Sequence, residues 1–329
     1  MSQCLFCLKD YADLTEEHVF PAALGGVLVV ERSVCATCNH GFSKFEQPLA
    51  MELAPLRSLL KIPDRYGKVP EAAATVKTKE EEYAAKVLAD GTVRLKRIVT
   101  EVTGSGGRRE FIHRFTTAKQ KAELEEEAQK RGHELIEMGR GEPQEAEVHV
   151  GGEFNLVDAS EGLRTVSKIA YVGLAFKAGA RTAASDAFKE VRAYIATGAG
   201  PCPTRLFVNP KFSGAVQQGP HQHAIILAGR RDMKRVDAIV RLFGELNYFV
   251  TLSDHYEGVD FGYTLLYDAC RGQADGILVS DLQFEFLATL DVATSPETTW
   301  DDLAASSQFF CNFLQEAVTR KIERAQADL

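Results

Sequence analysis

The first 39 residues decide how the N-terminal part of this chain folds; they include Cys4-Leu5-Phe6-Cys7, then Leu14-Thr15-Glu16-Glu17-His18-Val19-Phe20-Pro21 and Ala22-Ala23-Leu24-Gly25-Gly26, and finally Cys35-Ala36-Thr37-Cys38-Asn39. Four of the seven cysteines lie here, as two Cys-x-x-Cys pairs. This spacing lets both thiolates of a pair reach one ion from a tight turn, and two pairs complete a tetrahedral sulfur shell for zinc. We therefore expect one zinc ion to be bound by Cys4, Cys7, Cys35 and Cys38.

A site with four thiolate ligands is closed, because no coordination position is left for a substrate. The zinc would then be structural and would hold together a segment too small to build its own core. The alternatives are a chance cluster or a redox pair, but two Cys-x-x-Cys pairs are a strong metal-site signal, and disulfides are rare in a reducing compartment. Any chemistry must come from other residues.

A carboxylate followed directly by a histidine and an apolar-proline turn, as in Glu17-His18-Val19-Phe20-Pro21, is an uncommon string. The order Cys-x-x-Cys, Glu-His-Val-x-Pro, Gly-Gly and Cys-x-x-Cys-Asn resembles the HNH endonuclease family with the ββα-metal fold, in its variant stapled by four cysteines. The resemblance covers about residues 1–46, and its motifs are specific in combination. Nothing after roughly residue 60 contributes to it.

The resemblance implies roles for three polar residues. His18 would be the general base that deprotonates a water for attack on the scissile phosphate, a task that suits a side chain with an unperturbed pKa near neutrality. Glu17 would point to the opposite side of the same strand and bind a divalent cation. Asn39, opening the helix after the second cysteine pair, would be the second ligand. Two oxygen ligands leave most of an octahedral shell to water and phosphate, which suits catalytic Mg2+ or Mn2+.

One departure concerns the residue that orients the base. Family members usually carry an asparagine in the strand before the second cysteine pair, whereas Val27–Val34 contains none. Glu31 or Ser33 could supply this hydrogen bond instead. A lone histidine beside a glutamate is more often a surface pair than a catalyst, and a zinc module that kept the fold but lost cleavage is the main competing interpretation. The flanking cysteine pairs favour the catalytic role for His18.

A second departure concerns the ligand set and the substrate contacts. One helical turn after Asn39, where some family members have a further ligand, this chain has Ser43, and the nearest alternatives are His40 and Glu46. His40 is as well explained by a solvent-facing position as by a phosphate contact. The residues that we consider as possible substrate contacts are His40, Lys44, Arg108 and Arg109.

Composition limits the classes of protein that this chain can be. With 329 residues, 45% hydrophobic and 26% charged, it is typical of an ordinary globular protein with room for two domains. No apolar run approaches the roughly 20 residues of a membrane-spanning helix, and no secretory signal is visible, so we expect a cytoplasmic protein. The formal net charge of −8 argues against coating nucleic acid by bulk electrostatics, but it allows a nuclease with a local basic groove.

Three regions are expected: the nuclease module at residues 1–60, a connecting region of β-hairpin and helix at 61–143, and a recognition or dimerisation domain at 144–329. The connecting region has alternating stretches on both sides of Asp90-Gly91, which is a strong hairpin turn. Its basic residues could follow a phosphate backbone, although a solvated sheet edge explains them equally well; they include Arg94, Lys96, Arg97, Arg108, Arg109 and Arg114.

The C-terminal region is expected to be an α+β domain with an antiparallel sheet covered by helices on one side. Ser160–Ala178 has the pattern of an amphipathic helix, with Arg164, Lys168 and Lys177 expected on its solvated face. His221 and His223 are better explained by packing or surface roles than by a metal site. The other expected elements are helices at Ala118–Gly132, Ala187–Ile195 and Trp300–Ala325 and strands at His223–Ala228, Ala238–Leu242, Tyr248–Leu252 and Tyr263–Tyr267.

The sequence therefore predicts a metal-dependent endonuclease that hydrolyses DNA, most simply double-stranded DNA, with a structural zinc and a catalytic Mg2+ or Mn2+. Residues 1–60 contain four basic and seven acidic residues, so this segment alone should hold DNA weakly, and a homodimer is one way to add affinity. The resemblance implies a bacterial restriction or anti-phage defence effector. The alternatives are a non-catalytic zinc-stapled binding or adaptor protein and an RNA-cleaving nuclease.

Overall fold

The computed structural model describes residues 2–77, 82–88, 92–96, 98–103, 109–114, 118–136, 147–150, 160–206, 219, 221–244, 246–271 and 273–275. The chain divides into two compact units. The first joins Met1–Leu53 and Leu60–Lys68 to the chain from Phe154 onward, and the second contains Ala54–Leu59 and Val69–Glu153. The predicted connecting turn at Arg140–Gln144 and the predicted helix at Trp300–Ala325 lie outside the described residues.

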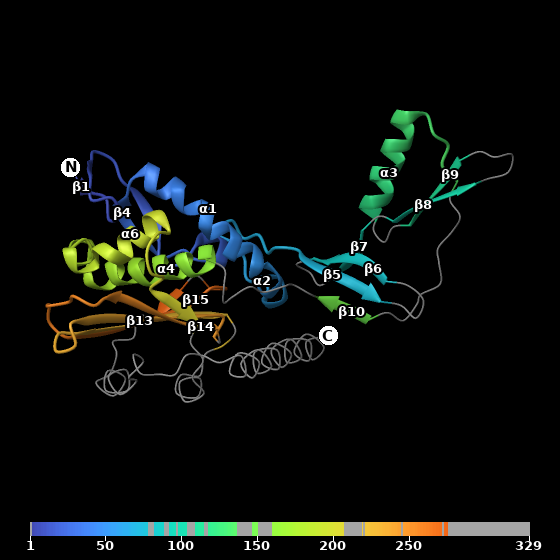
Figure 1. Ribbon diagram of the computed structural model, residues 1–329. Helices are drawn as coiled ribbons and strands as arrows, with labels where there is room; N and C mark the ends of the chain where they lie inside the picture. Colours follow the sequence, from blue (N-terminus) through green and yellow to red (C-terminus); the bar gives the residue numbers. More distant parts are fainter. Residues whose placement is uncertain are drawn as a thin grey trace. The chain divides into compact units, whose positions relative to one another are not determined.

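A six-stranded antiparallel sheet forms one layer of the first unit (Figure 1). Its strand order is β11-β14-β13-β12-β15-β16. The four long strands fall where strand-like runs of the sequence predict them, and all four expected strands are confirmed. The bounds are β11 Thr204–Leu206, β12 Gln222–Arg230, β13 Arg235–Leu242, β14 Leu246–Ser253, β15 Phe261–Asp268 and β16 Gln273–Asp275.

Helices lie on one face of this sheet, as expected for the predicted α+β class (Figure 1). α4 spans Ser160–Ala178 and ends before Gly179, and α6 spans Lys189–Thr197 and ends at Gly198, whose φ of +71° suits a residue without a side chain. Between them lie α5 Ala180–Ala183 and the 3-10 turn η2 Asp186–Phe188. The confirmed helices follow the predicted bounds closely, except that Ala187 and Phe188 belong to η2.

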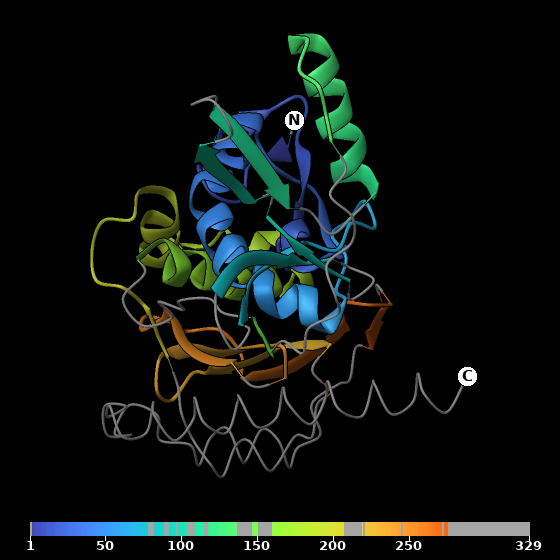
Figure 2. The ribbon, with the colours of Figure 1, turned by 90° about the vertical axis from the view of Figure 1, so that its right-hand side faces the viewer.

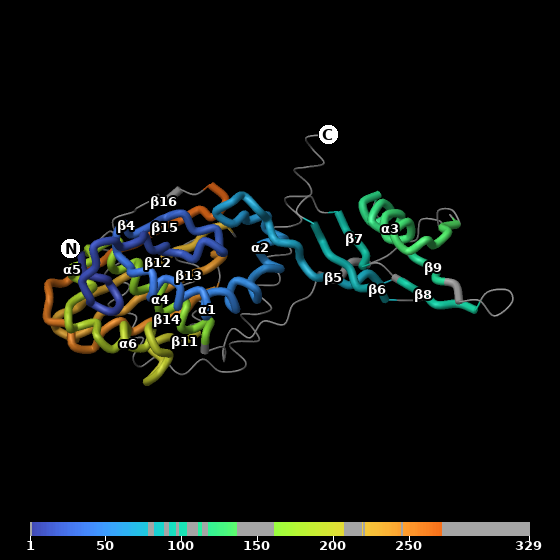
Figure 3. The backbone as a smooth tube through the Cα atoms, turned by 90° about the horizontal axis from the view of Figure 1, so that it is seen from above, coloured from blue at the N-terminus to red at the C-terminus, as the bar shows by residue number. Residues whose placement is uncertain are grey.

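The N-terminal module lies on the other side of α4, so that α4 is the middle layer between the sheet and the module (Figure 2). In Figure 3, which is seen from above, the backbones of the module, of α4 and of the sheet overlap. The module consists of a two-stranded pair, a β-hairpin with a 3-10 turn, and one long helix. Its elements are β1 Ser2–Gln3, β2 Asp10–Tyr11, β3 Thr15–His18, η1 Ala22–Leu24, β4 Val29–Val34 and α1 Ala36–Glu52.

Helix α1 begins earlier than the sequence suggested. Cys35 is its N-cap residue in an extended conformation, so the second cysteine pair lies in the first turn and Asn39 follows it inside the helix. Pro48 lies within α1 and does not end it. The break comes at Leu53, after which α2 (Ala54–Leu60) carries Pro55 in its first turn, where the missing backbone N–H costs no helical hydrogen bond.

Helix α4 is buried on more than one side, and this corrects the expected solvated face. Lys168 is only 2% exposed, and Thr165 and Ser167 are fully buried together with most of the apolar residues of the helix. The reason is that α4 contacts both α1 and the sheet. On the sheet side, a Cβ at Gly173 would lie 2.6 Å from Cδ1 of Ile225, so the missing side chain allows the helix to approach β12 closely.

Buried polar side chains join the N-terminal module to the rest of the first unit. The Tyr171 hydroxyl lies 3.0 Å from the carbonyl oxygen of Leu5, and the Tyr267 hydroxyl lies 2.5 Å from that of Gly25. His223 is fully buried; its Nε2 is 3.2 Å from the carbonyl oxygen of Leu24, and its Nδ1 accepts a hydrogen bond from a backbone N–H. The expected packing role of His223 is confirmed.

The second unit contains a four-stranded sheet in the order β10-β5-β6-β7, a separate hairpin and helix α3. β6 and β7 pair antiparallel, as the expected hairpin requires, although Asp90-Gly91 lies outside the described residues. Helix α3 carries the expected i,i+4 ion pairs, such as Lys130 with Glu126. The bounds are β5 Ala72–Lys77, β6 Glu82–Val87, β7 Val93–Leu95, β8 Ile98–Thr103, β9 Arg109–Arg114, α3 Ala118–Arg131 and β10 Glu147–Val150.

Among the described helices, none combines the length and hydropathy that a membrane span needs.

Replacing Tyr171 by phenylalanine removes the hydroxyl between the Leu5 and Ala183 carbonyl oxygens and leaves the ring in place. We expect the free energy of unfolding to fall by about 1–3 kcal/mol, because a buried acceptor loses its partner. Urea denaturation followed by circular dichroism measures this loss. Tyr66→Phe is the matched control, because Tyr66 is 77% exposed and should change stability little. Equal effects of the two variants would contradict the anchoring role of Tyr171.

Candidate active site

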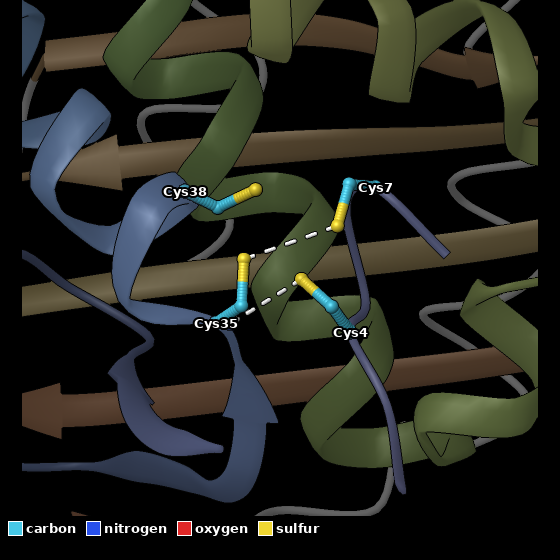
Figure 4. A group of neighbouring side chains, drawn as sticks. All are labelled: Cys4, Cys7, Cys35 and Cys38. Carbon is cyan, nitrogen blue, oxygen red and sulfur yellow. Dashed lines mark hydrogen bonds between the residues drawn. The ribbon is translucent and has the colours of Figure 1, made fainter. Parts of the chain in front are cut away.

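The four N-terminal cysteines converge, as Figure 4 shows. Their four sulfur atoms all lie within 4.8 Å of one another, and Sγ of Cys7 is 3.9 Å from Sγ of Cys35. A tetrahedral zinc with Zn–S bonds of about 2.3 Å requires sulfur–sulfur separations of about 3.8 Å. The backbone N–H of Cys35 donates to Sγ of Cys4 at 3.3 Å, and this bond opposes the rise in the pKa of Cys4 that burial causes. These residues therefore fit a structural zinc site.

A tight loop between β3 and β4 holds the Glu17-His18 pair in place. The backbone N–H of Val19 donates to the carbonyl oxygen of Leu28, and β3 pairs with β4 so that His18 lies opposite Val29. A Cβ at Gly26 would lie 1.9 Å from the carbonyl oxygen of Phe20, so only glycine allows the loop to close this tightly. The Gly-Gly motif is thus a steric requirement for the position of His18.

His18 is half-buried, and within the described part of the chain no group hydrogen-bonds to either of its ring nitrogens. Burial lowers the pKa of His18 below its ordinary value; the Glu16 carboxylate opposes this effect, and the cations Arg65 and Lys168 add to it. Burial therefore favours the neutral imidazole, which has a ring nitrogen able to accept a proton. Both properties suit a general base.

Glu17 is buried, at 3% exposure, while its neighbour Glu16 on the strand is exposed. The Lys168 ammonium of α4 donates to Oε1 of Glu17 and to Oε1 of Glu46 on α1. The two carboxylates hold the pKa of Lys168 above its ordinary value although burial acts to lower it, so the ammonium stays charged. Glu17 and Glu46 are thus paired with an internal cation.

Asn39 does not join this group of charges. It is exposed on α1, and its Nδ2 donates to Oγ1 of Thr15 at 3.0 Å. Glu17 faces Lys168 and is almost without solvent contact, whereas Mg2+ keeps several of its waters in protein sites. In this arrangement the residues around Glu17 do not fit a hydrated divalent cation. The assignment of Glu17 and Asn39 as its ligands stays a prediction.

The proposed replacements for the missing asparagine do not contact His18. The hydroxyl of Ser33 donates to the carbonyl oxygen of Val30 at 2.7 Å, and Glu31 is exposed. Neither supplies a hydrogen bond to the His18 ring, whose nitrogens have no such partner in the described residues. His18 is held by the strand pairing and by packing instead.

The possible substrate contacts fall into two groups. His40 and Lys44 are exposed on α1, in the same module as His18. Arg108 lies outside the described residues, and Arg109 begins strand β9 of the second unit. The substrate roles of all four residues stay predictions.

Sequence reasoning missed Lys168 and Arg65 as parts of the surroundings of His18. Lys168 lies on a helix with the pattern of a solvated face, and Arg65 lies on a loop after α2. Glu46 was considered only as an alternative ligand. A lysine among apolar helix residues was the available signal, but the sequence does not reveal a partner 151 residues away.

Replacing Cys38 by serine should abolish stoichiometric zinc binding, because a hydroxyl is a poor zinc ligand beside three thiolates. We expect the melting temperature of the first unit to fall by roughly 10 °C or more, since a lost structural metal removes several kcal/mol. Zinc content and thermal unfolding are measured on the same preparation. Cys202→Ser is the matched control, because Cys202 is exposed and lies outside the cluster. Full zinc retention in Cys38→Ser would refute the assignment.

Comparison with known proteins supports the identity of this segment. Residues 4–54 match the family model described as HNH endonuclease. No curated protein and no solved structure matches the chain significantly. The matched residues include both cysteine pairs, the Glu17-His18 strand and helix α1, which are the elements that carry the resemblance in the sequence. The segment from residue 4 to residue 54 is therefore similar to the HNH endonuclease family, and this similarity covers less than half of the chain.

Proposed function

We propose that this protein is a nuclease that hydrolyses phosphodiester bonds in nucleic acid, with His18 as the general base. The proposal is carried by one observation: a half-buried histidine, with no protein partner on its ring in the described residues, lies beside a zinc-compatible cysteine cluster in the segment that matches the HNH family model. His18 is the last residue of β3, just before the loop that contains the Gly-Gly motif.

In the proposed reaction, a ring nitrogen of His18 takes a proton from a water molecule as the water oxygen attacks the phosphorus atom. The bond from phosphorus to the leaving sugar oxygen then breaks. The prediction that Glu17 and Asn39 bind Mg2+ or Mn2+ for this reaction comes from the resemblance alone. We assign no step to such an ion, because Glu17 is paired with Lys168 in this structure.

DNA is the proposed substrate, and RNA is the alternative to be compared in the same assay. The N-terminal segment is acidic, so affinity must come from elsewhere in the chain or from a second copy, and the basic residues of the second unit are the available candidates. A homodimer, a cytoplasmic location and a role in anti-phage defence are proposals that rest on the sequence and the resemblance.

A second candidate function is a non-catalytic zinc-stapled binding or adaptor protein. Two observations favour it: the Lys168 ammonium is bonded to the carboxylate expected to bind a metal ion, and no described side chain orients His18 by a hydrogen bond. In this alternative, the buried charges serve folding only, and the module presents a surface rather than a reaction centre.

Replacing His18 by alanine should reduce cleavage of supercoiled plasmid by at least about 100-fold, because general-base catalysis contributes that much or more. The assay uses zinc-loaded full-length protein with Mg2+, with Mn2+ and without added divalent ion, and a matched RNA substrate runs beside the plasmid. His255→Ala is the control, since His255 is an exposed histidine of the same unit. Circular dichroism and zinc content confirm that both variants fold.

Equal cleavage by the wild type and His18→Ala would show that His18 is not the base. Absence of cleavage by folded, zinc-loaded wild type on plasmid, RNA and modified phage DNA would favour the non-catalytic alternative.

A further inference from the structure

The charged group at the centre of the first unit contains Glu17 from β3, Glu46 from α1 and Lys168 from α4. The exposed fractions of their side chains are 3%, 20% and 2%. The Lys168 ammonium also lies 4.9 Å from the centre of the Phe42 ring, within the range of a cation–π contact. Carboxylates and an aromatic face thus surround one cation, which is the environment that a buried ammonium requires.

Two further hydrogen bonds fix Lys168 at this point. Thr165 and Tyr171 lie three residues before and three residues after it, on the same face of α4. The Thr165 hydroxyl donates to the carbonyl oxygen of Phe45 at 2.8 Å. The Tyr171 hydroxyl donates to the carbonyl oxygen of Leu5 at 3.0 Å. The face of α4 that carries Lys168 is therefore bonded to the module on both sides of the ammonium.

The Lys168 ammonium and a divalent cation cannot both bind between Glu17 and Glu46. A second cation beside Lys168 would repel it strongly, because buried charges are poorly screened. Mg2+ and Mn2+ also keep several waters, for which a carboxylate at 3% exposure leaves little access.

We propose that the Lys168 ammonium takes the place of a divalent cation between Glu17 and Glu46 and acts as a positioning residue for the strand that carries His18. The two side chains that hold a cation are then those of Glu17 and Glu46, rather than those of Glu17 and Asn39. Lys168 lies outside the residues that match the family, so the C-terminal part of the chain completes the site of the module. The catalytic consequence rests on the proposed function, whereas the identity of the bound cation does not.

The test measures Mn2+ binding to zinc-loaded full-length protein by electron paramagnetic resonance of the free ion. Wild type and Glu17→Gln should bind the same number of Mn2+ ions, because Lys168 occupies the carboxylates. Lys168→Ala, which removes the charge and leaves the space of the side chain for an ion and its waters, should gain about one Mn2+ per chain. The gain should disappear in the double variants of Lys168→Ala with Glu17→Gln or with Glu46→Gln.

Lys177→Ala is the matched control, since Lys177 lies at the end of the same helix and contacts the Phe176 ring. It should gain no site. Glu190, Asp254 and His255 form an exposed cluster that could bind Mn2+ weakly, and this background is common to all variants.

Loss of a Mn2+ site in Glu17→Gln relative to wild type would overturn the proposal, because Glu17 would then be a metal ligand in the native protein. A folded Lys168→Ala without a new site would also overturn it. Where Lys168→Ala does not fold, the comparison of wild type with Glu17→Gln still decides the matter. These readouts need no cleavage, so failure of the proposed nuclease function is recognised separately in the plasmid assay.

Discussion

The bonds from the Lys168 ammonium to Glu17 and Glu46 are the constraint on which the first unit depends. Burying a charge costs several kcal/mol, and the cost is offset only when the partners are held in good geometry. The partners come from a strand, a helix of the module and a helix more than a hundred residues later. The N-terminal module and α4 must therefore be assembled together, or the three charges are left without compensation.

Two sets of side chains stabilise the N-terminal module in different ways. The four sulfur atoms join the turn after β1 to the first turn of α1, which is a local connection within about 35 residues. Lys168, Tyr171, His223 and Tyr267 join the module to the middle helix and to the sheet. The cysteine cluster therefore holds the elements of the module together, and the second set holds the module against α4 and the sheet.

The sequence predicted the parts whose causes are local. The cysteine spacing and the strand-like runs of the four long strands are properties of short segments, and the structure bears them out. The bounds of α4 also followed from its pattern and from Gly179. The burial of Lys168 could not be predicted, because helical periodicity does not tell whether a polar face meets water or a second layer. The division into residues 1–60, 61–143 and 144–329 stays a prediction.

The missing side chain at Gly173 sets how near α4 lies to the sheet, and its effect reaches the other face of the same helix. Any side chain there must displace Ile225, which is fully buried, or lift the helix from β12. A shift of the helix axis would move Lys168 relative to both carboxylates. A substitution at position 173 would therefore disturb the charged group of Glu17, Glu46 and Lys168 as well as the packing on β12, although Gly173 lies far in sequence from the N-terminal module.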